Sequence, residues 1–243
     1  SIESAEVVKH SINAFLALSV TFANEIAVLC ESVGADSAEV TRGLRSEARI
    51  GPKAYLAAGK AFSGGTLARD VAFLRHLSSV QRLRSPVINA IIESNQNHKH
   101  WVKRQILNLF DNLDGLPVTL WGLTYKPGTD TLRRSYAVEL ANWLIQQGVC
   151  LRVFDPVIKT LPKEFGKGVD RSLDPLASLA GSRLLIIGTD WPEFKSYGQE
   201  VLSSRNVDCK IIDPSGLLRY VPGLSGRHYL SVGYIPSKQK GNA

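Results

Sequence analysis

Residues 2–33 read IESAEVVKHSINAFLALSVTFANEIAVLCESV, and this stretch decides the fold of the first half of the chain. It contains neither proline nor glycine, so it predicts one uninterrupted helix about 48 Å long. Gly34 follows, and glycine is the residue type that most often ends a helix in the left-handed conformation. Apolar residues such as Ile12, Phe15 and Phe22 lie on more than one face, so the helix needs packing partners on several sides. A small helical domain cannot cover all of these faces, which predicts a homodimer through residues 2–33.

Three polar residues, Lys9, Asn13 and Asn24, interrupt the apolar character of this helix. Lys9 and Asn13 are one turn apart, and Asn24 follows three turns later on nearly the same face. A buried row of polar groups costs free energy unless another group bonds to it, so the row is a candidate functional site. The alternative is a lysine that extends its amine into solvent and asparagines that are solvated or cap a helix.

The composition is that of a soluble globular protein, with 44% hydrophobic and 21% charged residues among 243. The formal net charge is +7, without a lysine/arginine block or zinc-finger spacing. The charge is therefore weak evidence for nucleic acid, and we expect no nucleic-acid partner. A site for an anionic ligand such as a nucleotide diphosphate fits the charge as well. Three widely spaced cysteines indicate reduced thiols in a cytoplasmic protein and no metal site. No uncharged apolar run of about 18 residues is present, so we expect neither a membrane-spanning helix nor a membrane partner.

The first part of the chain, residues 1–114, predicts an all-helical domain. Asp36 is a candidate cap for a short helix, and residues 46–66, which are rich in glycine, predict an ordered loop. Apolar residues at helical spacing predict a helix over 66–80, and Pro86 begins a further helix over 86–111. The polar turn DNLDG at 111–115 marks the domain boundary.

Residues 115–243 predict a parallel sheet of the doubly wound kind, because strand patterns alternate with helix patterns. The expected helices are 136–148 and 172–181, and the expected strands are 118–126, 150–156, 182–190, 207–214 and 229–233. Ligands of such sheets bind at the carboxyl ends of the strands. Those ends carry Gly122, Tyr125–Lys126, Asp155, Thr189–Asp190 and Asp213.

Two loops carry candidate ligand-binding groups. In residues 63–66, Ser-Gly-Gly-Thr, the glycines let a ligand approach the backbone, and the following helix presents amide donors to an anion. Asp70 lies one turn into that helix. The second loop brings Lys126, Arg133 and Arg134 between a strand and a helix, where cations can hold phosphates. Either loop could instead be a simple turn, and the first strand lacks the GxGxxG fingerprint of dinucleotide sites.

The histidines give no metal site. His98 and His100 are two positions apart on an expected helix and cannot face one metal ion, so we expect both to be solvated. His10, His76 and His228 have no visible partner in the sequence.

Several segments together resemble the UDP-glucose/GDP-mannose dehydrogenase family over nearly the whole chain. They are KHSINAFLA with FANEIAVLCESVGAD, then ARIGPK, SGGTLARD, GLTYKPGTDTLRRS, VFDP and TDWPEF. The resemblance implies an α/β chain with an all-helical dimerisation domain (1–114) around a long central helix. A doubly wound, Rossmann-like domain of the UDP-sugar-binding type (115–243) follows it. The family's N-terminal NAD-binding domain has no counterpart here. We therefore expect the chain alone to bind no cofactor, and NAD to bind only if that domain is supplied in trans.

The resemblance also implies roles for individual residues. Lys9 and Asn13 match a lysine–asparagine pair that supports charge on the reacting oxygen, as an oxyanion hole does. Asp70 matches an aspartate that acts as a base or positions water in the hydrolytic step.

Other matches concern binding. Arg49 matches an arginine that reaches the sugar-nucleotide site of the partner subunit. Tyr125 and Lys126 match an aromatic–lysine pair at the nucleotide sugar, and Arg133 matches an arginine near NAD. The turn residues Ser63, Gly64 and Gly65 complete the expected ligand-binding set.

The chain departs from the family pattern at the reacting group. The family's nucleophile is a cysteine, and Thr66 stands at that position. Threonine without a base is a far poorer nucleophile than cysteine. Ala68 replaces a proline, Arg134 a glutamate and Tyr136 another proline, and the usual arginine after the fourth strand is missing from 213–215.

Three hypotheses follow. The first is a non-catalytic dimeric relative that binds a nucleotide sugar or a repurposed ligand such as a peptide handed to a partner enzyme. The second is a fragment or subunit of an active NAD-dependent dehydrogenase. The third is a structural interaction module without a small ligand, which the retention of Lys9, Asn13 and Asp70 disfavours.

Overall fold

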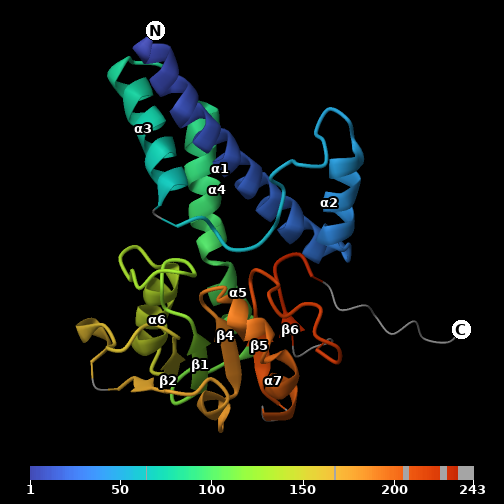
Figure 1. The fold of residues 1–243 in the computed structure, drawn as a ribbon, viewed down its shortest axis with the longest axis vertical. Helices are drawn as coiled ribbons and strands as arrows, with labels where there is room; N and C mark the ends of the chain where they lie inside the picture. Colours follow the sequence, from blue (N-terminus) through green and yellow to red (C-terminus); the bar gives the residue numbers. More distant parts are fainter. Residues whose placement is uncertain (64, 167, 205–207, 225–228, 235–243) are drawn as a thin grey trace, which may run out of the picture. The chain divides into compact units, whose positions relative to one another are not determined.

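The computed structural model describes residues 1–63, 65–166, 168–204, 208–224 and 229–234 (Figure 1). The chain forms two compact units, one of residues 1–101 with 232–234 and the other of residues 102–231. The first unit is helical, and the second is built on a six-stranded sheet. The predicted α/β class, with a long N-terminal helix and a parallel sheet, is confirmed. The tail over 237–243, His228 and Gly64 lie outside the described residues.

Helix α1, Ile2–Val33, forms over the predicted residues. The Ser1 hydroxyl accepts a hydrogen bond from the Ser4 N–H at its start, and Gly34 ends it with a φ of 80°. By length and composition alone α1 also passes for a membrane span, and 39% of its most apolar 18-residue window is buried. The core helix of a soluble protein passes the same test.

The other helices of this unit are α2 (Ser37–Ser46), α3 (Thr66–Val80) and α4 (Pro86–Lys99). The single helix expected over 86–111 is wrong, because α4 ends at Lys99 and α5 (Trp101–Leu109) begins separately. At His100 the backbone N–H bonds to the carbonyl of Asn97, three residues back, so the regular α-helical ladder is interrupted.

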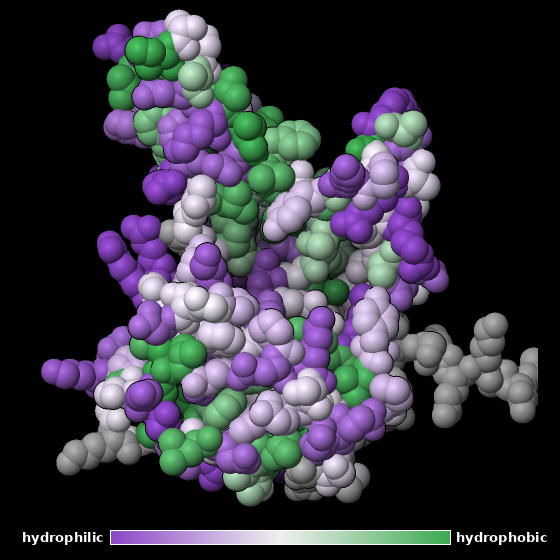
Figure 2. Space-filling model, in the orientation of Figure 1, coloured by the Kyte–Doolittle hydropathy of each residue, from purple (hydrophilic) through white to green (hydrophobic). Residues whose placement is uncertain are grey.

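The core of the helical unit lies where α1 packs against α3 and α4. Ala14 and Ala17 of α1 contact Val71 of α3 and Ile91 of α4, and small side chains on α1 allow the helices to approach closely. Other apolar side chains of α1 remain exposed, and Figure 2 shows hydrophobic side chains along this helix.

The sheet of the second unit has the strand order β3-β2-β1-β4-β5-β6, with every neighbouring pair parallel. The strands are β1 (Pro117–Trp121), β2 (Cys150–Phe154), β3 (Asp170–Arg171), β4 (Leu184–Ile187), β5 (Lys210–Ile212) and β6 (Tyr229–Leu230). A strand forms at each of the five expected segments, although each is shorter than expected. The two-residue edge strand β3 was not predicted, because it is too short to show a periodic pattern.

Helix α6 (Tyr136–Gln146) is confirmed, but the helix expected over 172–181 is reduced to the 3₁₀ turn η2 (Ala177–Leu179). Asp174 accepts a hydrogen bond from the N–H of Ala177 at 2.6 Å, which favours this tight turn over a longer helix. The unit also contains the 3₁₀ turns η1 (Lys163–Phe165) and η3 (Pro192–Lys195) and the helix α7 (Gly198–Ser204).

The strand order reverses direction between β1 and β4, so the carboxyl ends of these two strands form the switch point of the sheet. Ligands of open α/β sheets bind in the crevice at such a point.

Candidate functional site

Asp70 is the centre of a polar cluster in the helical unit. It lies on the first turn of α3, and its side chain is fully buried, with 0% exposure. Asn13 of α1 donates from Nδ2 to Asp70 Oδ2 at 2.5 Å, and Arg69 donates from Nε to Asp70 Oδ1 at 3.2 Å. The sequence analysis named Asn13 and Asp70 as separate candidates, and the structure joins them by a direct hydrogen bond.

Two further groups of α1 face the same carboxylate. Lys9 Nζ is 3.8 Å from Asp70 Oδ2, and His10 Nδ1 is 3.4 Å from Asp70 Oδ1. The His10 ring also stacks on Phe73, with ring centroids 4.0 Å apart. The expectation that His10 has no partner is wrong. Its position three residues before Asn13, on the same helix face, was the available signal.

These contacts decide the charge of Asp70. Burial alone raises its pKa, but the hydrogen bonds from Asn13 and Arg69 and the charges of Lys9 and His10 outweigh burial, so that the pKa is lowered. The cluster therefore holds an ionised carboxylate within the helical unit. Such a group can accept a proton or orient a bound hydroxyl.

The turn before α3 presents Thr66 to solvent. Gly65 is the N-cap of α3, no side chain caps this terminus, and the side chain of Thr66 is exposed. Ser63 accepts a hydrogen bond from the Gly65 N–H through its carbonyl at 2.6 Å. Among the described residues, no base bonds to the hydroxyl of Thr66. Asp70 is one turn further along the same helix.

Buried amides fix the approach to this turn. Asn24 Oδ1 accepts from the N–H of Gly59 at 2.8 Å, and Asn95 bonds to both backbone groups of Phe62 at 2.8 and 2.9 Å. His98 Nε2 bonds to the carbonyl of Gly59 at 2.7 Å, so the expectation of a solvated His98 is wrong. Asn24 thus holds the loop and does not extend the Lys9–Asn13 row.

Arg49 stays apart from this cluster. It lies in an exposed turn, and its Nε donates to Glu47 Oε1 at 2.9 Å. No contact between Arg49 and Asp70 occurs in the described structure.

In the second unit, the switch point is closely packed. Gly122 follows β1 with a φ of 87°, and a Cβ added there would lie 2.5 Å from the Cβ of Thr189. The Thr189 hydroxyl donates to the carbonyl of Thr124 at 2.6 Å. Glycine is therefore required where the ends of β1 and β4 meet.

The loop that starts here is held by Asp155, which follows β2. Its carboxylate accepts N–H bonds from Leu123 and Thr124 through one oxygen, and from Val157 and Ile158 through the other, at 2.7–3.3 Å. Asp155 is consequently a structural anchor, although its position at a strand end suggested a ligand contact.

The same loop carries the predicted nucleotide-sugar residues. The N–H of Tyr125 bonds to the carbonyl of Thr131 at 2.8 Å, and Ser135 caps α6. Tyr125 is half-buried, while Lys126 and Arg133 are exposed. Within the part of the chain that the structure describes, neither of these two cations has an acidic partner. Both remain available to an anionic ligand.

Asp213, which follows β5, is fully buried. Its Oδ2 accepts from the hydroxyl of Tyr229 at 2.8 Å and from the N–H of Leu218 at 2.7 Å, whereas Oδ1 has no hydrogen-bond partner among the described residues. Burial raises the pKa of this carboxyl. Burial therefore disfavours the ionised form of Asp213.

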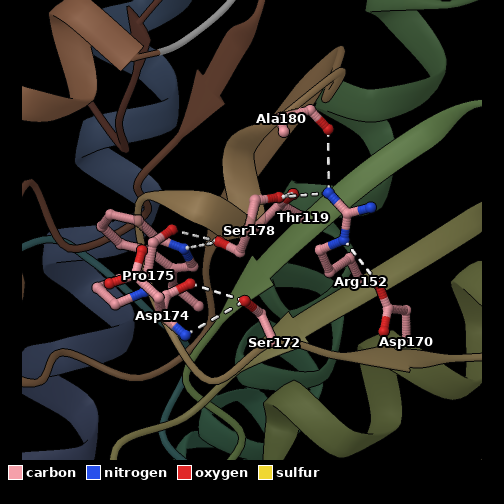
Figure 3. Close-up of polar contacts among 9 residues, drawn as sticks. Thr119, Arg152, Asp170, Ser172, Asp174, Pro175, Ser178 and Ala180 are labelled. Atoms are coloured by element: carbon pink, nitrogen blue, oxygen red, sulfur yellow. Dashed lines mark hydrogen bonds and ion pairs between the residues drawn. The ribbon is translucent and has the colours of Figure 1, made fainter.

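A second polar network lies on the strand-amino side of β2. Figure 3 shows the Arg152 guanidinium between Asp170 and the carbonyls of Ser178 and Ala180, with bonds of 2.9–3.1 Å. A cavity of about 230 Å³ adjoins this network. It is lined by the first residues of β1 and β2, and Cys150 is one of them. The sequence analysis placed candidate ligand residues only at the carboxyl ends of the strands and did not predict the Arg152 network.

These features define a chain with two domains. In the helical domain, Lys9 and Asn13 of the long helix α1 face Asp70 of α3, and the second domain is a doubly wound parallel sheet. Residues 3–97 match the UDP-glucose/GDP-mannose dehydrogenase family, central domain. Residues 119–219 match the UDP binding domain of the same family. The chain therefore belongs to the UDP-glucose/GDP-mannose dehydrogenase family, and the resemblance found in the sequence is confirmed.

Known proteins support this assignment. UDP-glucose 6-dehydrogenase TuaD of Bacillus subtilis (strain 168) is 33% identical over 196 residues, which cover 80% of this chain and 42% of that protein. UDP-glucose 6-dehydrogenase of Rickettsia bellii (strain RML369-C) is 32% identical over 231 residues, covering 93% and 53%. A solved UDP-glucose dehydrogenase from the archaeon Pyrobaculum islandicum superposes with a TM-score of 0.78 at 26% identity, covering 96% of this chain and 51% of that one.

The chain thus spans about half the length of the curated relatives it matches. Because residues 3–97 match a domain of this family and α1 packs against α3 and α4, α1 is a core helix of a soluble protein.

Proposed function

We propose that this chain is a dimeric binding protein for a nucleotide sugar, with UDP-glucose as the first candidate, and that it does not oxidise its ligand. The observation that carries the proposal is the state of the Asp70 cluster. Lys9, Asn13 and Asp70 are assembled, while the exposed Thr66 stands where the family resemblance implies a cysteine. The cluster offers polar groups to a sugar hydroxyl but lacks a nucleophile that can be activated.

The second unit, considered by itself, also carries groups suited to bind a nucleotide diphosphate. Lys126 and Arg133 are exposed cations without an acidic partner in the described structure, and Tyr125, the half-buried neighbour of Lys126 in the chain, is aromatic. Guanidinium and ammonium groups form charge-assisted hydrogen bonds with diphosphate oxygens. The names of the relatives, UDP-glucose 6-dehydrogenases, favour a UDP-sugar as the source of that diphosphate.

A repeating apolar stripe on α1 supports the homodimer. Val8, Phe15, Phe22 and Leu29 recur every seven residues and are 44–68% exposed. Ile12 and Val33 each follow a member of this series by four residues, which is the other apolar position of a heptad, and they are 56% and 69% exposed. Two helices pack along such a seam when apolar residues alternate at three- and four-residue spacing. A second copy of the chain is the occupant we propose for this stripe.

A second candidate function is catalysis as a fragment or subunit of an active NAD-dependent UDP-sugar dehydrogenase, with an NAD-binding domain contributed from outside residues 1–243. The matched residues cover only about half of each relative's length, which favours this function. NAD would then bind only in that assembly.

Calorimetric titration with UDP-glucose and UDP-glucuronate, with NAD as a control ligand, tests the binding proposal. We expect binding of a UDP-sugar in the absence of NAD, and a loss of affinity of about tenfold or more in Lys126→Ala. Lys159→Ala, which removes another exposed lysine of the same unit, should bind normally. No heat with either UDP-sugar would overturn the proposal and direct the search to peptide ligands.

Two further measurements separate the remaining alternatives. Light scattering should give a dimer that Phe15→Asp converts to monomer, whereas Leu173→Asp, at a 79% exposed apolar residue of the second unit, leaves it dimeric. A wild-type monomer at micromolar concentration would contradict the dimer. NADH production by Thr66→Cys with NAD and UDP-glucose would show that this chain alone suffices for oxidation.

A further inference from the structure

The connection between α3 and α4 forms a basic cavity that the proposed nucleotide-sugar site does not use. The cavity measures about 420 Å³ and lies within the helical unit. It is lined by Arg75, Ser79, Leu83, Arg84, Ser85, Pro86 and Asn89. This volume falls within the range of small-molecule sites.

The two arginines of the cavity have no counter-charge. Neither Arg75 nor Arg84 forms a hydrogen bond or ion pair with another described residue, and both are exposed. The sequence from 71 to 92 contains no aspartate or glutamate. Glu3 and Glu6 belong to α1, whose N-terminus lies at the same end of the unit (Figure 1), but neither lines the cavity.

The arginines are also not needed to neutralise the end of α3. The last carbonyls of that helix accept backbone N–H bonds, Leu77 from Gln81 and Ser78 from Leu83, at 3.0 and 2.8 Å. Arg82 adopts a φ of 54°, which folds the chain back over the helix end. Because the backbone satisfies these groups, the guanidinium groups of the cavity keep all their donors for another partner.

Neutral donors of the cavity are equally uncommitted. Ser85 is the N-cap of α4 but makes no side-chain capping bond, so the N–H groups of Val87 and Ile88 have no cap. The side chains of Ser79 and Asn89 form no hydrogen bond with a described residue. Two guanidinium groups, two hydroxyls and an amide thus line one space, and such donors are the ones that phosphate oxygens prefer.

We propose that this cavity is a binding site for a phosphoryl group, and that its size and two cations suit a diphosphate or a phosphate ester better than a single phosphate ion. The apolar edge formed by Leu83 and Pro86 would contact the organic part of the ligand. The site is independent of the Asp70 cluster, so its failure would leave the nucleotide-sugar proposal untouched.

The test is a thermal-shift titration of the full chain with inorganic pyrophosphate at low ionic strength. We expect pyrophosphate to raise the melting temperature, and the concentration for half the effect to increase about tenfold or more in Arg75→Gln/Arg84→Gln. Arg82→Gln removes the same charge from the same connection but from a residue outside the cavity, and should change this concentration less than twofold. An unchanged response in the double variant, or an equal loss in Arg82→Gln, would overturn the proposal.

A second arm identifies the source of the phosphoryl group. Co-sedimentation with phosphatidylglycerol vesicles, compared with phosphatidylcholine vesicles, reports a lipid headgroup. Binding to the anionic vesicles that the double variant loses supports the site with a lipid ligand, whereas pyrophosphate binding without vesicle binding supports it with a soluble ligand. No binding in either arm overturns the proposal.

Discussion

Replacing Asp70 by asparagine should destabilise the helical unit at neutral pH and not at acid pH. The substitution keeps the size of the side chain and removes its charge. In the wild type, the buried carboxylate receives the hydrogen bond of Asn13 at 2.5 Å and that of Arg69 at 3.2 Å. The Lys9 ammonium lies 3.8 Å from Asp70 Oδ2, and His10 Nδ1 lies 3.4 Å from Asp70 Oδ1.

Most of the expected destabilisation comes from the buried hydrogen bond between Asn13 and Asp70. A hydrogen bond to a charged group contributes about 1.5–3 kcal/mol. The side chains of Lys9 and Arg69 are 57% and 62% exposed, so solvent screens their ion pairs with Asp70 and each adds less than about 1 kcal/mol. We therefore expect Asp70→Asn to reduce the free energy of unfolding by about 2 kcal/mol, which lowers the melting temperature of a chain of this size by about 4–8 °C.

The pH dependence gives the sharper test. Because the pKa of Asp70 is lowered in the folded state, its contribution is present above the ordinary carboxyl pKa and is lost as the pH falls through the folded value. Calorimetric melting of Asp70→Asn and wild type should differ at pH 7 and converge toward pH 3. Glu93→Gln, an exposed acid of the same unit, should change little at either pH. A difference between Asp70→Asn and wild type that does not vary with pH would refute the charged cluster.

Three other substitutions have defined outcomes. Gly122→Ala should lower the free energy of unfolding by about 2–4 kcal/mol in denaturant titration, because alanine would have to adopt a positive φ and its Cβ would lie 2.5 Å from the Cβ of Thr189. Gly128→Ala, with a positive φ in open space, should cost only about 1 kcal/mol. Asp213→Asn should gain stability relative to wild type as the pH rises above the ordinary carboxyl pKa, because burial raises the pKa of Asp213 and makes its ionisation unfavourable in the fold. A melting-temperature difference that does not vary with pH would contradict this. Lys9→Met should leave the melting temperature within a few degrees but weaken UDP-glucose binding in calorimetry about tenfold, and unchanged affinity would remove Lys9 from the ligand site.

The sequence was sufficient for the elements whose signals are local. Helix α1 follows from an uninterrupted helical stretch and its terminal glycine, and the strands follow from short apolar runs bounded by turns. The break at His100 was missed, because the sequence around it contains neither glycine nor proline.

The site was predictable only in part, for a physical reason. Asp70 stands one turn after Thr66, so the sequence places both on one helix face. The bond between Asn13 and Asp70 joins residues 57 positions apart. The bonds of Asn24 and His98 to Gly59 join side chains to backbone groups 35–39 positions away. Backbone groups carry no sequence signal, so the structural role of Asn24 could not be separated from a ligand role.

The geometry of the cluster distinguishes residues that the fold itself requires from those that it does not. Asp70 is buried and Asn13 bonds to it directly, so each would be retained to keep the other's polar group satisfied, even without a ligand. Lys9 differs, because its side chain is 57% exposed and its ion pair adds little stability. Retention of Asp70 and Asn13 is consequently weak support for binding. An exposed lysine beside a buried, ionised carboxylate is the group through which a ligand would contact this cluster.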